Sequence, residues 1–284
     1  MNDDFAVSLA GVHVYPIKSC AGVDAAAAML VETGLEFDRA WMLVDADNEF
    51  VTQRELPRMA LVQPTLKQHD MVLRAPGMLA LHVALDAVEQ PTRVRVWNDE
   101  VAAYDMGDLA AQWFSDFLQA KLRLVRFDPE QKRLSSKRWS AGIEAENAFS
   151  DGYPLLVVSN ASLDELNRRL AAAGHAAVEM RRFRPNLVLD GLDAHGEDFI
   201  DELRLDSADG PVRLKLTKPC SRCPIPNIDP VTAEPGDEPL ATLSGYRADR
   251  RVDGAITFGV NAVVIEGIER VLKPGLMGAA SIRF

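Results

Sequence analysis

Short alternating segments, each closed by turn residues, constrain the fold of this chain more than any other feature. Val7–Ile17 and Arg39–Asp45 are strand candidates, and shorter strand-like runs continue as far as Val96. The turn residues 45–48 are typical of a hairpin that joins Arg39–Asp45 to Glu49–Gln53. Many short strands broken by turns favour a small barrel or sandwich. We therefore expect a mainly β, α+β fold.

Two segments have helical spacing instead. Apolar residues in Leu109–Leu118 recur on one helical face. A second helix is expected from Leu163 to about Ala173, with Ser162 as its N-cap and Glu165 completing a capping box. Gly174 is a suitable residue to end it.

The stretch from residue 128 to residue 148 is polar and has little periodicity, so we expect a flexible connection there. Strand-like runs resume beyond it, at Tyr153–Val158, Asn186–Asp190, Val212–Leu216 and Ile256–Val264. We therefore expect two domains, one over residues 5–127 and one over residues 128–284.

Composition limits the classes of partner. The net charge of −11 over 284 residues disfavours the basic surface that nucleic-acid binding requires, although a local basic pocket is compatible with it. No stretch approaches the roughly 18 to 20 apolar residues that span a bilayer. The acidic start at residues 1–4 lacks the basic region of a secretory signal, and three cysteines do not make a disulfide framework. We expect a cytoplasmic protein that binds neither nucleic acid nor membrane.

Cys220 and Cys223 lie three positions apart, after a strand-like run and before three prolines. A structural zinc site normally needs four ligands, and the third cysteine, Cys20, is distant in sequence, while the five histidines show no ligand spacing. The prolines disfavour a thioredoxin-like helix start. Two interpretations remain: a reactive thiolate, favoured by the charges of Lys218 and Arg222, or a buried, inert cysteine pair.

Basic residues that enter or follow strands are candidates for anion binding. Lys18 and Ser19 follow a strand, and Arg39 begins one. A second group, more typical of an anion clamp, is Arg181, Arg182, Arg184 and Asn186. A third group, Arg247, Arg250 and Arg251, fits a solvated surface at least as well. We interpret Trp41 and Trp97 as strand and core residues rather than as stacking platforms.

Taken together, these motifs resemble a known family. Three of them resemble the N-terminal β-barrel domain that precedes MOSC domains (molybdenum cofactor sulfurase C-terminal domains): Tyr15–Cys20, Gly34–Met42 and Phe50–Arg54. Others resemble the MOSC domain itself: Phe149–Leu156, Arg182–Asn186, Lys218–Cys223, Asp229–Pro230, Pro239–Leu243 and Phe258–Asn261. The pattern is most similar to the mitochondrial amidoxime-reducing component and to bacterial reductases of N-hydroxylated bases. This resemblance implies an N-terminal barrel-like domain followed by a MOSC β-barrel with flanking helices.

The resemblance also implies a molybdenum-molybdopterin cofactor whose metal is bound by Cys223, with Cys220 as a bystander. Family contacts to the cofactor, carried onto matching positions, fall on Lys18, Ser19, Arg39, Ser159, Asn160, Arg184, Asn186, Ser221 and Arg222. The chemistry agrees, because a thiolate is a soft metal ligand and the cofactor's phosphate suits lysine, hydroxyl and arginine donors. Since both halves contribute residues, we expect the pocket at the seam between the domains.

The activity implied is reduction of N-hydroxylated compounds, such as hydroxylaminopurines or amidoximes. Some bacterial relatives carry a ferredoxin-like domain, and this sequence has no corresponding set of four cysteines. We therefore expect a separate ferredoxin-type or flavin reductase as electron donor. Asp229 is a candidate for proton relay, although capping of its own loop is favoured. Two alternatives are a carrier of molybdopterin or sulfur without turnover, and a non-catalytic C-x-x-C metal module.

Overall fold

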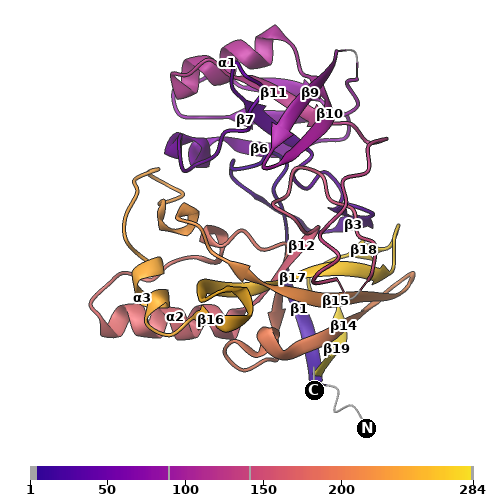
Figure 1. The fold of residues 1–284 in the computed structure, drawn as a ribbon, viewed down its shortest axis with the longest axis vertical. Coiled ribbons are helices and arrows are strands. Elements are labelled where there is room, and N and C mark those ends of the chain that lie inside the picture. Colours follow the sequence, from indigo (N-terminus) through magenta and orange to yellow (C-terminus); the bar gives the residue numbers. More distant parts are fainter. Residues whose placement is uncertain (1–4, 89, 141, 283–284) are drawn as a thin grey trace.

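The computed structural model describes residues 5–88, 90–140 and 142–282; the acidic start at residues 1–4 and the last two residues of the expected second domain lie outside these ranges. The expected mainly β architecture is confirmed. Figure 1 shows two parts, an upper one coloured indigo to magenta and a lower one mostly orange to yellow. Within the described ranges, no helix has the length and apolar content needed to cross a membrane.

The lower part is a closed barrel. Its strands follow the order β12 (Leu155–Ser159), β13 (Leu187–Asp190), β1 (Phe5–Val14), β19 (Met277–Ile282), β14 (Ile200–Ser207), β15 (Gly210–Ser221) and β17 (Ala255–Glu266). Pairing of β12 with β17 closes the ring, and only β12 and β13 run parallel. Residues such as Leu9, Leu203 and Leu214 alternate inward and form one apolar core, which is the packing that closes a small barrel.

Shorter elements surround the barrel. Strand β2 (Val23–Asp24) pairs antiparallel with the end of β1, and β16 (Ala248–Asp249) pairs antiparallel with the start of β17. Strands β18 (Val271–Leu272), β3 (Ala28–Val31) and β4 (Gly34–Leu35) make a small sheet. The 3-10 helices are η1 (Pro57–Leu61), η2 (Met180–Arg182), η3 (Gly196–Phe199), η4 (Ile225–Asn227) and η5 (Arg250–Val252).

Two helices, α2 (Asn160–Ala172) and α3 (Leu240–Ser244), pack on the outside of the barrel (Figure 1). The expected start of α2 is wrong by three residues. Ser159 caps the helix by accepting a hydrogen bond from the Ser162 backbone N–H at 3.2 Å, so Ser162 lies in the first turn. The expected end is confirmed, because Gly174 follows the helix with a φ of +82°.

The upper part contains two small sheets and one helix. One sheet has the order β5 (Trp41–Val44), β11 (Arg123–Phe127), β10 (Asp99–Asp105) and β9 (Pro91–Val96). The other is β6 (Gln63–Leu66), β7 (Asp70–Arg74) and β8 (Leu81–Ala84). Helix α1 (Asp108–Leu118) buries its apolar face, including Phe114 and Phe117, against both sheets. The expected hairpin is present, with Val44 bridging to Phe50.

The first strand belongs to the lower part. Ser8 of β1 faces Asp190 of β13 on one side and Met277 of β19 on the other. The chain therefore contributes β1 to the barrel wall, leaves the barrel to build the upper part, and returns to it at β12. A division between residues 127 and 128 stays a prediction, although β1 belongs to a barrel whose six other strands all follow residue 150.

Residues 128–148 do not form the free linker that their composition indicated. The segment has no regular helix or long strand among its described residues, yet Arg133 fixes it. Its Nη1 donates to the Asn147 side-chain oxygen at 2.6 Å and to the carbonyls of Ala148 and Ser150 at 2.9 and 2.7 Å. The Nε of the same buried guanidinium donates to Asp99 at 2.8 Å, so one side chain gathers four acceptors, which composition alone does not reveal.

Candidate functional site

A cavity of about 450 Å³ lies between the upper part and the rim of the barrel. This volume is in the usual range for small-molecule sites. Eight of the ten residues expected at the site line it: Lys18, Ser19, Arg39, Arg184, Asn186, Ser221, Arg222 and Cys223. Its walls come from segments that are distant in sequence, from Lys18 to Asn261, so the fold itself assembles the site.

The loop that carries Cys223 is shaped by prolines. Strand β15 has β14 as a neighbour only as far as Lys215, and the register with β17 shifts around Pro219. A proline is tolerated there because that strand edge needs no second ladder of hydrogen bonds. Pro224 then starts η4. The half-buried Cys223 therefore lies in a rigid turn at a strand end, as its neighbours predicted.

Cys220 and Arg222 contact each other in the same loop. The Arg222 Nη1 lies 3.0 Å from the Cys220 sulfur, and its Nη2 donates to the Phe183 carbonyl at 2.8 Å. Its Nε is buried and has no hydrogen-bond partner within the described ranges. Cys220 thus helps to orient a guanidinium that keeps one unused donor.

Two further guanidinium groups contact one ring. The guanidinium carbons of Arg39 and Arg184 lie 4.4 and 4.3 Å from the centroid of the buried Tyr15 ring. Arg39 has a carboxylate partner, Asp38, at 2.6 Å. Arg184 has the backbone carbonyl of Cys20 instead, and its Nη2 is buried without a partner among the residues described.

The electrostatics of this pair favour an anion. Burial, together with the positive charge of Arg39, lowers the pKa of Arg184 to about 10. Burial also raises the pKa of Tyr15 to about 12, although both arginines oppose that change. An anion placed between the guanidinium groups would relieve their repulsion and take up the unused donor of Arg184.

Lys18, in contrast to Arg184, already has an acidic side chain beside it. Its ammonium donates to Asp151 and, at 2.9 Å, to the Phe149 carbonyl. Burial lowers the pKa of Lys18, and Asp151 partly offsets that effect. Desolvation opposes ionisation of Asp151, but Lys18, the Trp97 N–H and Arg39 together hold the pKa of Asp151 well below its usual range. The ionised carboxylate in turn favours the charged form of Lys18.

Three site residues have left-handed backbone conformations. The φ angles of Ser19, Arg39 and Arg184 are +67°, +49° and +56°. Non-glycine residues avoid this region unless the surrounding structure enforces it, and such residues concentrate at functional sites. The strain is distributed over all sides of the cavity, which indicates that the positions of these side chains matter.

Comparison with known proteins agrees with this arrangement. The MOSC N-terminal beta barrel domain matches residues 6–121, and the MOSC domain matches residues 144–280. The chain is 36% identical to mitochondrial amidoxime reducing component 2 of Rattus norvegicus, over 83% of this chain and 71% of the relative. The chain belongs to the MOSC family. It is also 34% identical to mitochondrial amidoxime-reducing component 1 of Homo sapiens, over 84% and 72%.

A more distant relative is matched over only part of its own length. This MOSC protein is 29% identical to human molybdenum cofactor sulfurase, over 83% of this chain and only 28% of that protein. Relatives of this chain thus carry names with different activities, so the site has to decide between them.

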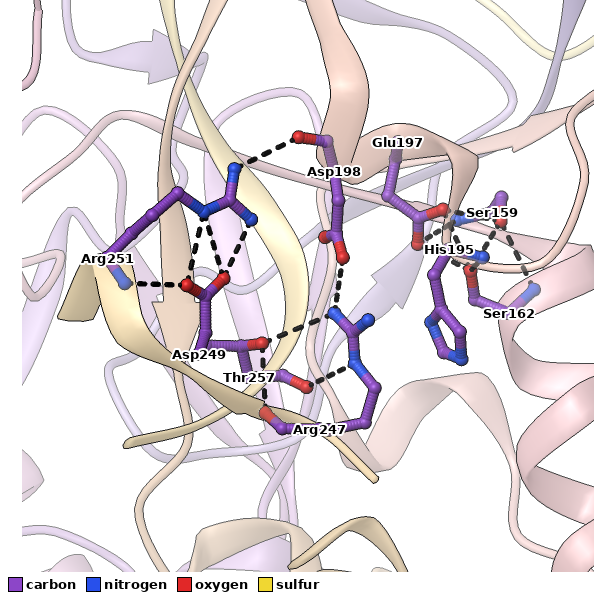
Figure 2. A network of polar contacts seen from close by, with 9 residues as sticks. All are labelled: Ser159, Ser162, His195, Glu197, Asp198, Arg247, Asp249, Arg251 and Thr257. Atoms are coloured by element: carbon purple, nitrogen blue, oxygen red, sulfur yellow. Dashed lines mark hydrogen bonds and ion pairs between the residues drawn. The ribbon is translucent and has the colours of Figure 1, made fainter. Parts of the chain in front are cut away.

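Two of the ten expected residues lie away from the cavity of this MOSC protein. Figure 2 shows Ser159 in a separate buried network, where its hydroxyl donates to Glu197 at 2.8 Å and caps α2. Asn160 donates to Asp190 at 2.8 Å. Neither lines the cavity, and the hydrogen bonds of both are used elsewhere.

The same network contains buried acids. Glu197 and Asp198 are buried, and burial raises the pKa of both. Arg247, for which a solvated surface position was one interpretation, leaves only 11% of its side chain exposed and contacts Asp198 at 2.6 Å (Figure 2). Buried acids and their partners hold η3 against the barrel.

The predicted arginine clamp is only partly realised. Arg184 lines the cavity, whereas Arg182 contacts Asp229 at 2.8 Å and the exposed Arg181 contacts Glu179 at 2.5 Å. Asp229 accepts hydrogen bonds from the backbone N–H groups of residues 231 and 232, which confirms its loop-capping role. Asn186 lines the cavity, but its amide already joins Leu156 to the carbonyl of His13.

Sequence reasoning missed the acid and the aromatic residue at the cavity. Asp151 was part of a quoted motif without an assigned role, and Trp97 was expected in the core. That expectation is wrong, because Trp97 lies in the turn between β9 and β10, is 43% exposed and lines the cavity. The expectation for Trp41 is confirmed, since it is fully buried in β5.

Cys223 has no protein partners for a metal site of the structural zinc type. Within residues 5–88, 90–140 and 142–282, no three His, Cys, Asp or Glu side chains come together to bind a metal. Cys20 is buried in the upper core, and burial raises the pKa of its thiol to about 12. A metal at Cys223 would have to bring most of its own ligands, as a metal held by an organic cofactor does.

Proposed function

We propose that this protein reduces N-hydroxylated compounds with a molybdenum-molybdopterin cofactor in the cavity. The observation that carries the proposal is the pair of buried, unused guanidinium donors on Arg184 and Arg222, in the cavity that Cys223 lines. Unsatisfied buried donors are rare, and two in one cavity favour an anionic ligand. The activity for which the amidoxime-reducing relatives are named supports the same proposal.

The residues present fit this cofactor. Arg39, Arg184 and Lys18 supply cationic donors for a phosphate, and the hydroxyl of Ser19 lies in the same wall. Cys223 would supply the thiolate ligand, and Arg222 and Lys218 line the same cavity. When bound, the cofactor supplies two-electron redox chemistry at molybdenum.

The overall reaction balances simply. An N–OH group takes up two electrons and two protons, and the products are an N–H group and water. The chain contributes orientation and charge: the guanidinium groups position the anion, and the rigid turn holds Cys223. We propose that the electrons come from a separate ferredoxin-type or flavin reductase, and that the protein acts in the cytoplasm without contact to membrane or nucleic acid.

Metal analysis of matched cysteine variants tests this function. The wild type, Cys223→Ser and Cys220→Ser are produced in a host that makes molybdopterin. We expect about one molybdenum per chain in the wild type and in Cys220→Ser, and none in Cys223→Ser. Reduction of benzamidoxime with a chemical electron donor should follow the metal content. Absence of molybdenum from all three proteins would contradict the proposal.

The same experiment separates the carrier alternative. A protein that retains molybdopterin or carries a persulfide on Cys223, yet reduces no N-hydroxylated compound, would be a carrier. The match to molybdenum cofactor sulfurase makes that outcome worth testing. The unused donors of Arg184 and Arg222 fit both functions, and turnover alone distinguishes them.

A further inference from the structure

An aromatic surface interrupts the cationic lining of the cavity. Trp97, which follows β9, has a φ of +55° and leaves 43% of its side chain exposed. Its ring packs against Phe50 at a centroid distance of 4.9 Å, and the Arg54 guanidinium lies 5.0 Å from the ring centroid. Trp97 and Arg54 both line the cavity. We call this pair the aromatic wall.

The aromatic wall is fixed to the residues expected to bind the cofactor. The Trp97 indole N–H donates to Asp151 Oδ1 at 3.1 Å, and the same oxygen accepts from Lys18. On the other side, the Arg54 Nε donates to Thr52 Oγ1 at 3.0 Å. Gln53, between them, donates its side-chain amide to the Ser19 carbonyl. A surface held in this way is pre-organised for a ligand.

Core packing does not account for Trp97. A large aromatic residue in a tight turn with a left-handed backbone costs free energy, and here it also exposes apolar surface in a cavity lined by lysines and arginines. An exposed indole with an adjacent guanidinium is a combination that binds planar conjugated rings, because both groups stack on π faces. A phosphate or a small acyclic group gains little from such a surface.

We propose that Trp97 and Arg54 stack the planar ring of the substrate, so that the protein prefers N-hydroxylated purines and aryl amidoximes to acyclic N-hydroxylated compounds. The inference rests on the proposed function for the N-hydroxyl group, but ring binding is separable from reduction. Trp97 is a specificity residue that contacts the part of the substrate that does not react.

Steady-state kinetics on molybdenum-loaded protein provide the first test. Trp97→Ala should raise the KM for 6-hydroxylaminopurine about tenfold, which is within the range for the loss of one stacked base. The KM for acetamidoxime, which has no ring, and the molybdenum content should stay unchanged. Trp97→Phe should recover most of the loss. The control is Leu109→Ala, an exposed apolar residue of α1 outside the cavity.

Calorimetric titration with adenine provides a readout that does not require turnover. Wild-type protein should bind adenine, and Trp97→Ala should weaken that binding about tenfold. If the wild type binds adenine through Trp97 but reduces neither substrate, the proposed function fails and the ring site stands. Equal effects on both substrates, unchanged adenine binding, no binding by the wild type, or loss of molybdenum from Trp97→Ala would each overturn the inference.

Discussion

Replacing Arg184 by methionine should affect stability far less than the same replacement at a second buried arginine. Arg184 has no carboxylate partner and repels Arg39, whereas Arg247 contacts the buried Asp198 at 2.6 Å and donates to the Thr257 carbonyl at 3.1 Å. Methionine keeps most of the length and removes the charge at both positions. The two variants therefore compare an arginine that serves to bind a ligand with an arginine that stabilises the fold.

The magnitude for Arg184 follows from opposing terms. Its pKa falls from 12.5 to about 10, which corresponds to roughly 3 kcal/mol of disfavoured charge in the folded state. Water in the open cavity screens this charge, so about 1 to 2 kcal/mol is a better figure. Losing the hydrogen bond to the Cys20 carbonyl and the contact with Tyr15 costs about as much. Cofactor-free Arg184→Met should therefore remain within about 1 kcal/mol of the wild type.

Removing Arg247 leaves a buried acid without its partner, and such changes cost about 3 to 5 kcal/mol. Urea unfolding of both variants, made in a host without molybdopterin, measures the contrast. Molybdenum content of the same variants from a competent host completes the test, and we expect Arg184→Met to lose the metal. Equal destabilisation by the two substitutions would refute the argument that Arg184 is unpaired for the sake of an anion.

Two further predictions concern the network of Figure 2. Ser159→Ala should cost about 1 to 2 kcal/mol in urea unfolding because α2 loses its N-cap, while molybdenum content stays at the wild-type level; a stable variant without metal would instead make Ser159 a cofactor contact. His195 has two buried, unpaired ring nitrogens, and burial, aided by Arg247, lowers its pKa from 6.5 to about 4. The unfolded chain takes up this proton first, so the stability that neutral His195 contributes is present above about pH 6.5 and is lost as the pH falls toward 4. His195→Phe should reduce this pH dependence of the urea midpoint, and an unchanged slope would count against the assignment.

Local patterns predicted the elements of this fold better than their boundaries. Helix α1 was foreseeable because its apolar face is periodic and complete in one segment. The start of α2 was not, since Ser159 and Ser162 are both good caps by type. Both hydroxyls also take part in a distant contact, because Glu197, 35 positions beyond Ser162, accepts from Ser159 and from Ser162. Competition of this kind depends on tertiary contacts that no local window contains.

The site was predictable as a set of residues but not as a geometry. Motifs gave the cations and Cys223, whereas the left-handed backbone at Ser19, Arg39 and Arg184 has no signature in residue type. Trp97 was misassigned because an aromatic residue next to an alternating segment normally belongs to a strand. Its exposure follows from a tight turn between β9 and β10, and the second of these strands was not expected from the sequence.

The position of β1 has a consequence for how the chain reaches its native state during synthesis. This strand ends at Val14, whereas one of its barrel neighbours, β19, starts only at Met277, so β1 leaves the ribosome long before β19 does. At typical rates of about 5 to 20 residues per second, β1 waits on the order of tens of seconds for that neighbour. The upper part, whose two main sheets pair only among themselves, can fold in the meantime. Until β19 arrives, the barrel has an open edge, and exposed edges of this kind are where chaperones and misfolding compete.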